Sequence, residues 1–456
     1  MASQTAPHPG CPPPGDTMKI LFKGLALAAL CAGTAQAANT TDRLVPFEQF
    51  VRDTSAARLS TFQGLAGTRV QNEAAFNEMR QHVLSLYDGV RVDHSFMLDT
   101  QVFDCVPVAQ QPSVRLLGLK GVEAPPAPSS PSTPFVKESG EQPRAAASPL
   151  ERGKQDPFGN ELRCESGTIP MRRVTLEGLS RFESLRHFLG KGPDGAGRPF
   201  SGSSALAPVT HRYAHAYQWA YNYGGESRLN LWSPPINTGA GQIFSLSQHW
   251  YVGGSGAALQ TVEGGWQVYP ALYGTTNAVT FIYFTPDNYT TGCYNLDCPG
   301  FVQINPNWPL GGAWSIYSTF GGTQYEFRMQ WKFSGGNWWL FLQGNGTFDA
   351  VGYYPGSLYR GGQLSQFATE IDYGGETVGP DTFPPMGSGG WGGWGWTQAA
   401  YQRAVFYTDL ANAGQWSSLT SAQPSPSCYS LAYTPASSGG DWGTYFFFGG
   451  PGGWGC

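Results

Sequence analysis

The sequence predicts an all-β fold: an antiparallel β-sandwich domain at residues 209–456, preceded by a partly helical N-terminal region. Three observations carry this prediction. Of the 456 residues, 14% are aromatic and only 13% charged, with 61 Gly and 35 Pro, as is typical of β-rich exported proteins. All 15 Trp lie between Trp219 and Trp454. Short runs of period two recur in that half, without helical patterns between them.

The first 37 residues have the pattern of an export signal. MKILFKGLALAALCAGTAQA, residues 18–37, combines two Lys with a short apolar core and ends in a small-x-small cleavage site, Ala-Gln-Ala. Residues 1–17 read as an upstream extension, so Met18 is the expected start. The sequence therefore predicts a secreted protein, extracellular or periplasmic.

Residues 38–190 precede the first expected boundary, and residues 44–90 within them are expected to be helical. An apolar stripe recurs there at spacings of three and four: Phe76, Met79, Val83, Leu86 and Tyr87. Residues 122–159 are rich in Pro, Ser and charge, so we expect a disordered linker. The Gly-rich stretch 191–208 reads as a second, exposed linker.

The β-domain is expected at residues 209–456, where each strand candidate is bounded by Gly, Pro, Asn or Asp. The candidates are RLNLW, FSLSQHWYV, TVEGGWQVYP, VTFIYF, GFVQI, YEFRMQWKF, WWLFLQ, VGYY and TYFFF. The Gly/Trp-rich insert at 386–398 reads equally well as a surface loop or as an aromatic flap over a cleft.

Charge and hydropathy exclude two classes of partner. Residues 219–456 contain five Lys and Arg against 12 Asp and Glu, so the nucleic-acid class is not expected, because phosphate contacts need clustered basic residues. No apolar stretch of 18 residues follows the signal, so we expect no membrane anchor. A monomer is expected.

Six cysteines follow the signal. They are Cys105, Cys164, Cys293, Cys298, Cys428 and Cys456. An even number in an exported chain favours disulfides over metal binding, with 15 possible connectivities.

The sequence contains only weak signals for a metal site or for a catalytic serine. His211 and His215 have the i, i+4 spacing of a zincin helix, but the Glu of HExxH is missing between them. Ser255 lies in VGGSGAAL, which is not G-x-S-x-G. We therefore expect no metal and no cofactor, and the two histidines read as ordinary surface or core residues.

Carboxyl groups are the remaining candidates for catalytic residues. Glu263 in VEGGWQV and Glu376 in DYGGETV each lie in a strand-like run beside a Gly-Gly pair, and the glycines leave room for a ligand above the carboxylate. By strand alternation, Gln267 and Tyr269 share the face of Glu263, and Asp372 shares that of Glu376. Taken alone, both glutamates read as rim or hydrogen-bonded carboxylates, although paired carboxylates also drive hydrolysis.

Seven segments of the β-domain share one family pattern: GQIFSLSQHW, TVEGGWQVYPALYG, TGCYNLDCPGFVQIN, GNWWLFL, VGYYP, DYGGE and FFFGGPGGWGC. In this order they resemble the neprosin family, secreted glutamic peptidases that cleave after proline. Upstream, VFDCVPVAQQPS and CESGTIPMRRVTLEGL resemble the family's activation propeptide. The resemblance covers residues 102–185 and 208–456.

The resemblance implies a β-sandwich with a cleft across one face and a catalytic dyad of Glu263 and Glu376, with Asp372 as second-choice partner. It also implies the disulfides Cys105–Cys164, Cys293–Cys298 and Cys428–Cys456. Relatives commonly have Trp at the position of Tyr373 and Ala at the position of Gly264, which leaves the dyad intact.

The implied reaction is the hydrolysis of proline-containing proteins or peptides at acidic pH, with one glutamate as general base and the other as general acid. Gln267 or Tyr269 would support the oxyanion, and Trp266 and Tyr373 would support the substrate. The propeptide, residues 38–190, would cover the cleft until low pH loosens it and cleavage occurs within 188–210. The alternative is a carbohydrate-binding or glycan-cleaving β-sandwich, since Trp residues and paired carboxylates also suit sugars.

Overall fold

The computed structural model describes residues 44–119, 123–129, 131, 141–191, 210–434 and 440–456, all within one compact unit, Leu44–Cys456. We call residues 44–191 the N-terminal region and residues 210–456 the β-domain. The export signal and nearly all of the expected linker at 191–208 lie outside the described residues. Within the described part, no helix is long and apolar enough to cross a membrane.

The N-terminal region begins with the expected helices. Its helices are α1 (Phe47–Ala56), α2 (Leu59–Phe62), α3 (Glu73–Tyr87), α4 (Pro112–Leu117), α5 (Leu176–Ser180) and α6 (Leu185–Leu189). The side chain of Asn72 caps α3 by accepting a hydrogen bond from the Ala75 N–H. The predicted stripe from Phe76 to Tyr87 is buried, which confirms the helical interpretation.

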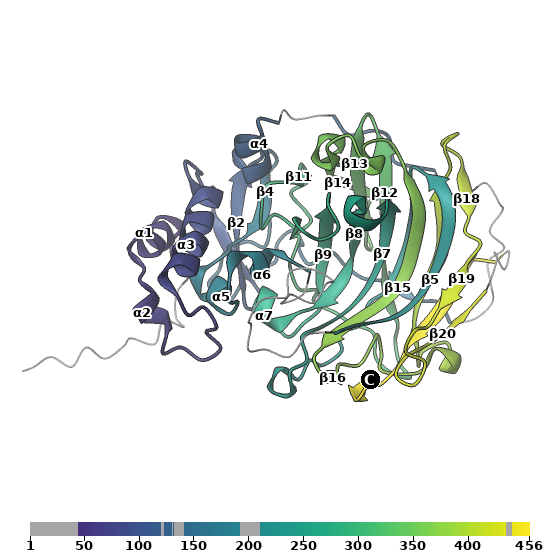
Figure 1. Ribbon diagram of the computed structural model, residues 1–456. Helices are drawn as coiled ribbons and strands as arrows, with labels where there is room; N and C mark the ends of the chain where they lie inside the picture. Colours follow the sequence, from purple (N-terminus) through teal and green to yellow (C-terminus); the bar gives the residue numbers. More distant parts are fainter. Residues whose placement is uncertain (1–43, 120–122, 130, 132–140, 192–209, 435–439) are drawn as a thin grey trace, which may run out of the picture. The chain divides into compact units, whose positions relative to one another are not determined.

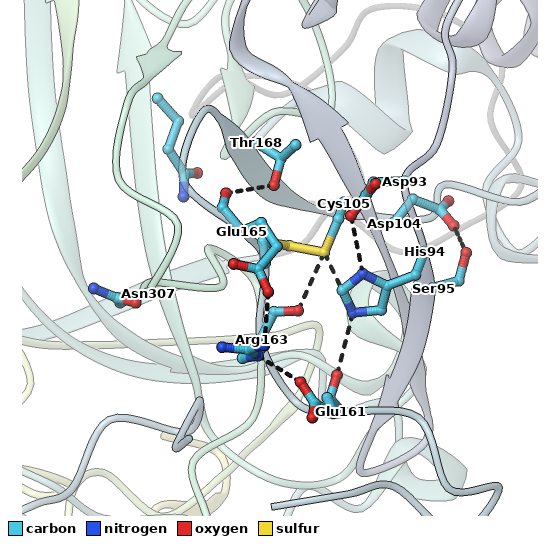
Figure 2. The surroundings of a disulfide bond; sticks show 12 residues. Asp93, His94, Ser95, Asp104, Cys105, Glu161, Arg163, Glu165, Thr168 and Asn307 are labelled. Atoms are coloured by element: carbon cyan, nitrogen blue, oxygen red, sulfur yellow. Dashed lines mark hydrogen bonds and ion pairs between the residues drawn. A yellow bond between two sulfur atoms is a disulfide. The ribbon is translucent and has the colours of Figure 1, made fainter. Parts of the chain in front are cut away.

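A small sheet follows in the N-terminal region. Strands β1 (Ser95–Leu98), β2 (Gln101–Pro107) and β4 (Thr168–Arg172) pair in the order β1-β2-β4. The disulfide Cys105–Cys164 joins β2 to the segment before β4, and Figure 2 shows it beside His94 and Arg163. This bridge is the one implied by the resemblance.

The β-domain contains a seven-stranded antiparallel sheet, the first sheet, with the order β10-β9-β8-β7-β15-β5-β19. Its strands are β5 (Thr210–Asn222), β7 (Phe244–Gly253), β8 (Gln260–Val268), β9 (Val279–Thr285), β10 (Cys293–Tyr294), β15 (Ala368–Gly379) and β19 (Thr420–Ala422). Figure 1 shows β9, β8, β7, β15 and β5 side by side.

The second sheet runs β11-β14-β13-β12-β6-β17-β21-β20, with β18 paired to β17. Its strands are β6 (Gly224–Asn230), β11 (Val302–Gln303), β12 (Tyr325–Ser334), β13 (Asn337–Gln343), β14 (Asp349–Pro355), β17 (Ala400–Thr408), β18 (Gly414–Trp416), β20 (Ser430–Tyr433) and β21 (Phe446–Gly449). The short α7 (Pro270–Tyr273) follows β8, and β16 (Thr382–Phe383) pairs with β22 (Gly453–Trp454). The rings of Tyr251 and Trp338 meet between the sheets at 5.9 Å, so the β-sandwich prediction is confirmed.

The two glycines beside Glu263 have different neighbours, one in the second sheet and one in the adjacent strand of the first sheet. A Cβ on Gly264 would lie 2.9 Å from Sδ of Met329, a flexible side chain of the second sheet. A Cβ on Gly265 would overlap the Ser247 carbonyl oxygen, which belongs to the backbone of β7. The two neighbouring glycines therefore face different constraints.

We expect Gly265→Ala to lower the free energy of unfolding by about 3 kcal/mol or more, because the β7–β8 pairing must open. Gly264→Ala is expected to cost about 1 kcal/mol, since Met329 can move. Urea unfolding of both variants at neutral pH, followed by Trp fluorescence, measures the difference. Equal losses in the two variants would contradict this assignment.

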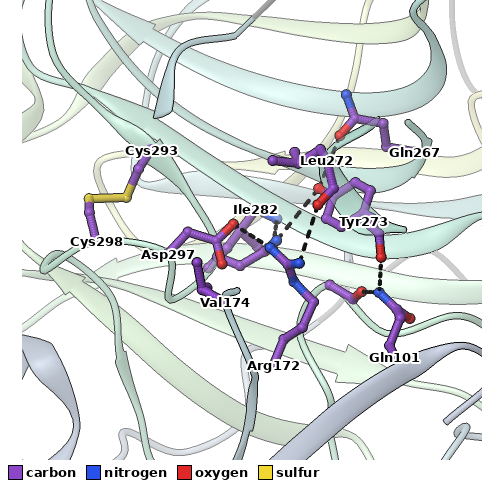
Figure 3. Close-up of polar contacts among 12 residues, drawn as sticks. Gln101, Arg172, Val174, Gln267, Leu272, Tyr273, Ile282, Cys293, Asp297 and Cys298 are labelled. Atoms are coloured by element: carbon purple, nitrogen blue, oxygen red, sulfur yellow. Dashed lines mark hydrogen bonds and ion pairs between the residues drawn. A yellow bond between two sulfur atoms is a disulfide. The ribbon is translucent and has the colours of Figure 1, made fainter. Parts of the chain in front are cut away.

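The N-terminal region and the β-domain share contacts at several places. β3 (Arg144–Ala145), inside the segment expected to be disordered, instead pairs in parallel with β12; backbone pairing with a strand needs no apolar side chains. Arg172 forms a buried ion pair of 2.8 Å with Asp297, in the loop closed by Cys293–Cys298 (Figure 3). The largest hydrophobic cluster contains residues of both parts, from Phe47 to Phe448.

The C-terminal end of the β-domain holds the third bridge, Cys428–Cys456, so all three disulfides implied by the resemblance are present. The Gly/Trp-rich insert lies nearby. Its 3₁₀ turn, Gly392–Trp394, bonds to β20 through the Gly392 N–H and Ser430, and Trp396 packs on Trp442 at 5.5 Å. The insert therefore packs on the second sheet and is not a flap over the glutamates.

Candidate active site

Glu263 and Glu376 lie on strands that flank the same central strand of the first sheet. Glu263 on β8 is opposite Trp250 of β7, and Glu376 on β15 is opposite Leu246 of β7. Gln248 lies between these two positions on β7, so the carboxylates approach it diagonally from both sides. Their side chains are 0% and 1% exposed, which means that the pair is closed to solvent in this structure.

Glycines flank Gln248 and make this approach possible. Its in-register neighbours are Gly265 on β8 and Gly374 on β15. Neither has a side chain, so no Cβ fills the space above Gln248. Gly374 has a φ of 152°, a conformation that glycine adopts readily and other residues do not. The prediction that the Gly-Gly pairs leave room beside the carboxylates agrees with this register.

Lys191 joins the two glutamates. Its Nζ lies 2.5 Å from Oε2 of Glu263 and 2.8 Å from Oε2 of Glu376, and it donates to Oε1 of Gln248 at 3.2 Å. An ammonium group has three donors, and these three acceptors use all of them. Burial by itself lowers the pKa of Lys191, but the two carboxylates outweigh it and raise that pKa above its ordinary value.

The remaining oxygen of Glu263 accepts hydrogen bonds from two hydroxyl groups. Thr261 Oγ1 donates to Oε1 at 2.7 Å and Tyr289 Oη donates at 2.9 Å. Burial, followed by the charge of Glu263, raises the pKa of Tyr289 well above its ordinary value, so this hydroxyl stays protonated. These two hydroxyl donors are neutral, and Lys191 supplies the positive charge in contact with Glu263.

Glu376 has a more strongly charged environment. Nδ1 of His211 lies 2.5 Å from Oε1, Tyr213 Oη donates to the same oxygen at 3.3 Å, and Gln248 Nε2 donates to Oε2 at 3.4 Å. Burial alone raises the pKa of Glu376, but Lys191 and His211 together lower it to about 2. Glu376 is therefore ionised here.

The other residues predicted for the first-sheet face lie apart from this centre. Asp372, the second-choice partner, pairs instead with Nε2 of His215 at 3.2 Å. Gln267 accepts from Tyr273 Oη and donates to Tyr294 Oη. Tyr269 is buried against Phe244 and, from the N-terminal region, Phe182. The contacts of Gln267 and Tyr269 in this structure are thus packing and hydrogen bonds near α7, and oxyanion support by either residue stays a prediction.

Trp266 and Tyr373 face the interior of the sandwich. The Trp266 indole donates to the Asn230 carbonyl oxygen of the second sheet. Tyr373 stacks on His249 with ring centroids 6.0 Å apart. Strand alternation puts both side chains on the face opposite to the glutamates, so the predicted support of the substrate by these residues is corrected to a role in the core.

Sequence reasoning missed six of the described residues that contact the pair: Lys191, His211, Tyr213, Gln248, Thr261 and Tyr289. In the sequence, His211 is interpreted as an ordinary surface or core histidine, and Lys191 as the first residue of the linker 191–208. The alternation of His and Tyr at 211, 213, 215 and 217 was a signal for a strand with one functional face, β5. Nothing in the sequence indicated that Gln248 would lie between the glutamates, because its position depends on the strand register.

Within the described residues, no three His, Cys, Asp or Glu side chains form a metal-binding group. Glu263 and Glu376 contact one cation from opposite sides of a strand, and in such a pair one group can be ionised while the other holds a proton. The fold and the site thus define an antiparallel β-sandwich protein with a buried carboxylate pair.

Residues 241–451 match the family model described as Neprosin, so the β-domain belongs to the neprosin family, as its sequence segments predicted. This membership supports a hydrolase of the peptidase class.

Two solved structures are similar at low level. One is described as Scytalido-glutamic peptidase with a peptide-based transition-state analog, with 10% identity and a TM-score of 0.32. The other is SCP-B, described as a member of the Eqolisin family of peptidases in complex with the tripeptide Ala-Ile-His, with 10% identity and a TM-score of 0.30. Each match covers 54% of this chain and 100% of the other.

Proposed function

We propose that this protein is a secreted glutamic endopeptidase, made as an inactive precursor, that hydrolyses peptide bonds after proline at acidic pH. The observation that carries the proposal is the contact of Glu263 and Glu376 with a single ammonium group, Lys191. Carboxylates held this closely cannot both stay ionised without a counter-charge. Once Lys191 leaves, the pair is expected to keep one proton.

One proton on two carboxylates suits hydrolysis of an amide. The ionised glutamate takes a proton from water, whose oxygen attacks the scissile carbonyl carbon, while the protonated glutamate gives its proton to the carbonyl oxygen. The tetrahedral diol then re-forms a C=O bond and breaks the C–N bond. The leaving nitrogen receives the proton first taken from water, and the diol returns a proton to the other glutamate. Gln248, between the two, could hydrogen-bond the developing oxyanion.

Latency follows from the position of Lys191. Its side chain is 5% exposed and occupies the space between the carboxylates, so water and substrate cannot reach them together. Lys191 is at the end of the N-terminal region, which in this proposal is the propeptide. Cleavage within residues 188–210, on the C-terminal side of Lys191, would release it. Three disulfides are consistent with secretion.

The glycan alternative is weakened by where the Trp side chains lie. Seven of the 15 Trp are buried: Trp232, Trp266, Trp308, Trp314, Trp331, Trp338 and Trp339. A buried ring cannot stack on a sugar, so the Trp content is in large part explained by the core.

The test is acid activation of the purified, exported protein. We expect incubation near pH 3 to remove the N-terminal region, and quenched peptides with Pro before the scissile bond to be cleaved at least tenfold faster than matched peptides with Ala. Activity should survive EDTA and fall as pH approaches neutral. N-terminal sequencing of the active form should begin within 188–210. Glycan cleavage with intact peptides, or a mature start near residue 38, would contradict the proposal.

A further inference from the structure

His211 contacts one glutamate of the pair and not the other. It is the second residue of β5 and lies opposite Val378 of β15, with its ring edge-on to Phe244 at 6.2 Å. Its Nδ1 lies 2.5 Å from Glu376 Oε1. Its Nε2 is buried without a hydrogen-bond partner in the described part of the chain. His211 belongs to the β-domain and would remain there when Lys191 leaves.

The two glutamates become unequal once Lys191 is gone. Glu263 keeps the hydroxyl groups of Thr261 and Tyr289, which are neutral donors. Glu376 keeps His211, whose hydrogen bond and charge help to lower the pKa of Glu376. The other titratable groups around His211 and Glu376 are Tyr213 on the same strand and, beyond β7, Glu263 and Tyr289. Asp372 and His215 form a separate neighbouring pair.

We propose that His211 is a positioning residue that keeps Glu376 ionised, which makes Glu376 the general base and Glu263 the general acid. The proposal rests on the function proposed above and assigns the two roles that the sequence left open. Because an ionised carboxylate can only accept hydrogen bonds, His211 donates through Nδ1 and fixes the Oε1 atom of Glu376. The other oxygen, Oε2, faces Gln248 and the space that Lys191 vacates, where a water would be activated.

The first test is His211→Asn in the processed enzyme. The Asn amide nitrogen occupies nearly the place of Nδ1, so the hydrogen bond is kept and the charge is lost. Without the charge, Glu376 should protonate at higher pH, and the acid limb of the kcat/KM profile should move up by about one pH unit or more. His211→Lys should restore the limb partly. His215→Asn, four residues along the same strand face, is the matched control and should leave the limb in place.

Two outcomes would overturn the proposal. A profile of His211→Asn that superimposes on wild type would show that the charge has no effect on Glu376. A uniform loss of a thousandfold or more at every pH would instead make the imidazole the base. In both cases wild-type cleavage is intact, so a failure of the proposed function, in which wild type cleaves nothing, is distinguishable.

Infrared titration of the carboxyl stretch supplies a readout independent of activity. In processed wild type, the band that protonates at the lower pH should vanish in Glu376→Gln, and the band that protonates at the higher pH should vanish in Glu263→Gln. The reverse assignment would overturn the proposal, even if the His211 variants do not fold.

Discussion

Glu376→Gln and Glu263→Gln are each expected to lower kcat of the processed enzyme by at least about a thousandfold, because each removes one half of a proton exchange that needs both groups. The double variant should be hardly worse than either single one, since residues that act as a unit are not additive. Initial rates on a proline-containing quenched peptide, measured from acidic to neutral pH, give the comparison.

Glu370→Gln is the matched control for these variants. Glu370 lies on the same strand as Glu376 and on the same face, but opposite Val252, away from Gln248. Glu370→Gln should keep wild-type activity. Circular dichroism should show that all three variants keep the wild-type fold. Retained activity in Glu263→Gln or Glu376→Gln would contradict the dyad, and loss in Asp372→Asn alone would move the site to the second-choice carboxylate.

Lys191→Gln should destabilise the precursor by about 3–5 kcal/mol at pH 7, because it leaves two buried carboxylates without their cation. The dependence on pH follows from Glu376. Its folded pKa of about 2 lies below the ordinary value of about 4.3, so the stabilisation is present above about pH 4.3 and is lost as pH falls toward 2. Lys191 stays protonated throughout this range.

The measurement is urea unfolding of the precursor at pH 7, 4 and 2.5. The gap between wild type and Lys191→Gln should be largest at pH 7 and smallest at pH 2.5. Lys154→Gln, which removes a lysine of the same N-terminal region that is 53% exposed beside Glu151, should cost less than about 1 kcal/mol. Processing of Lys191→Gln should also begin at higher pH than in wild type. An equal gap at every pH would contradict the assigned cause.

We do not expect the release of the N-terminal region by acid to start at Arg172–Asp297, the other buried ion pair between that region and the β-domain. Burial raises the pKa of Asp297 in spite of Arg172. A carboxyl group with a raised folded pKa binds its proton more readily in the folded state, so acid does not weaken folding through this group. The pH sensitivity of latency is therefore expected to reside at Glu376.

Much of the β-domain could be predicted from the sequence, and the reason is periodicity. The run FSLSQHWYV corresponds to β7 (Phe244–Gly253) and YEFRMQWKF to β12 (Tyr325–Ser334). Such strands can be predicted because successive side chains point to alternate faces, which leaves a period of two in the sequence. β5 was missed because it follows a Gly-rich stretch and carries polar residues on one face. From the sequence, Glu263 and Glu376 are predicted to act as a pair, and in the structure both contact Lys191. Gln248 and Lys191 could not be predicted, because register and tertiary contacts leave no local pattern.

The shared hydrophobic cluster has a consequence for how the chain folds. Phe182 and Phe188 of the N-terminal region belong to the same cluster as Tyr269 and Leu272 of the β-domain, and β3 supplies a strand partner to β12. The N-terminal region leaves the ribosome first and so can act as a template for a slow, long-range β topology. If the N-terminal region is removed as proposed, the β-domain loses this template, and we expect it to keep its shape through a high unfolding barrier, a kinetic form of stability.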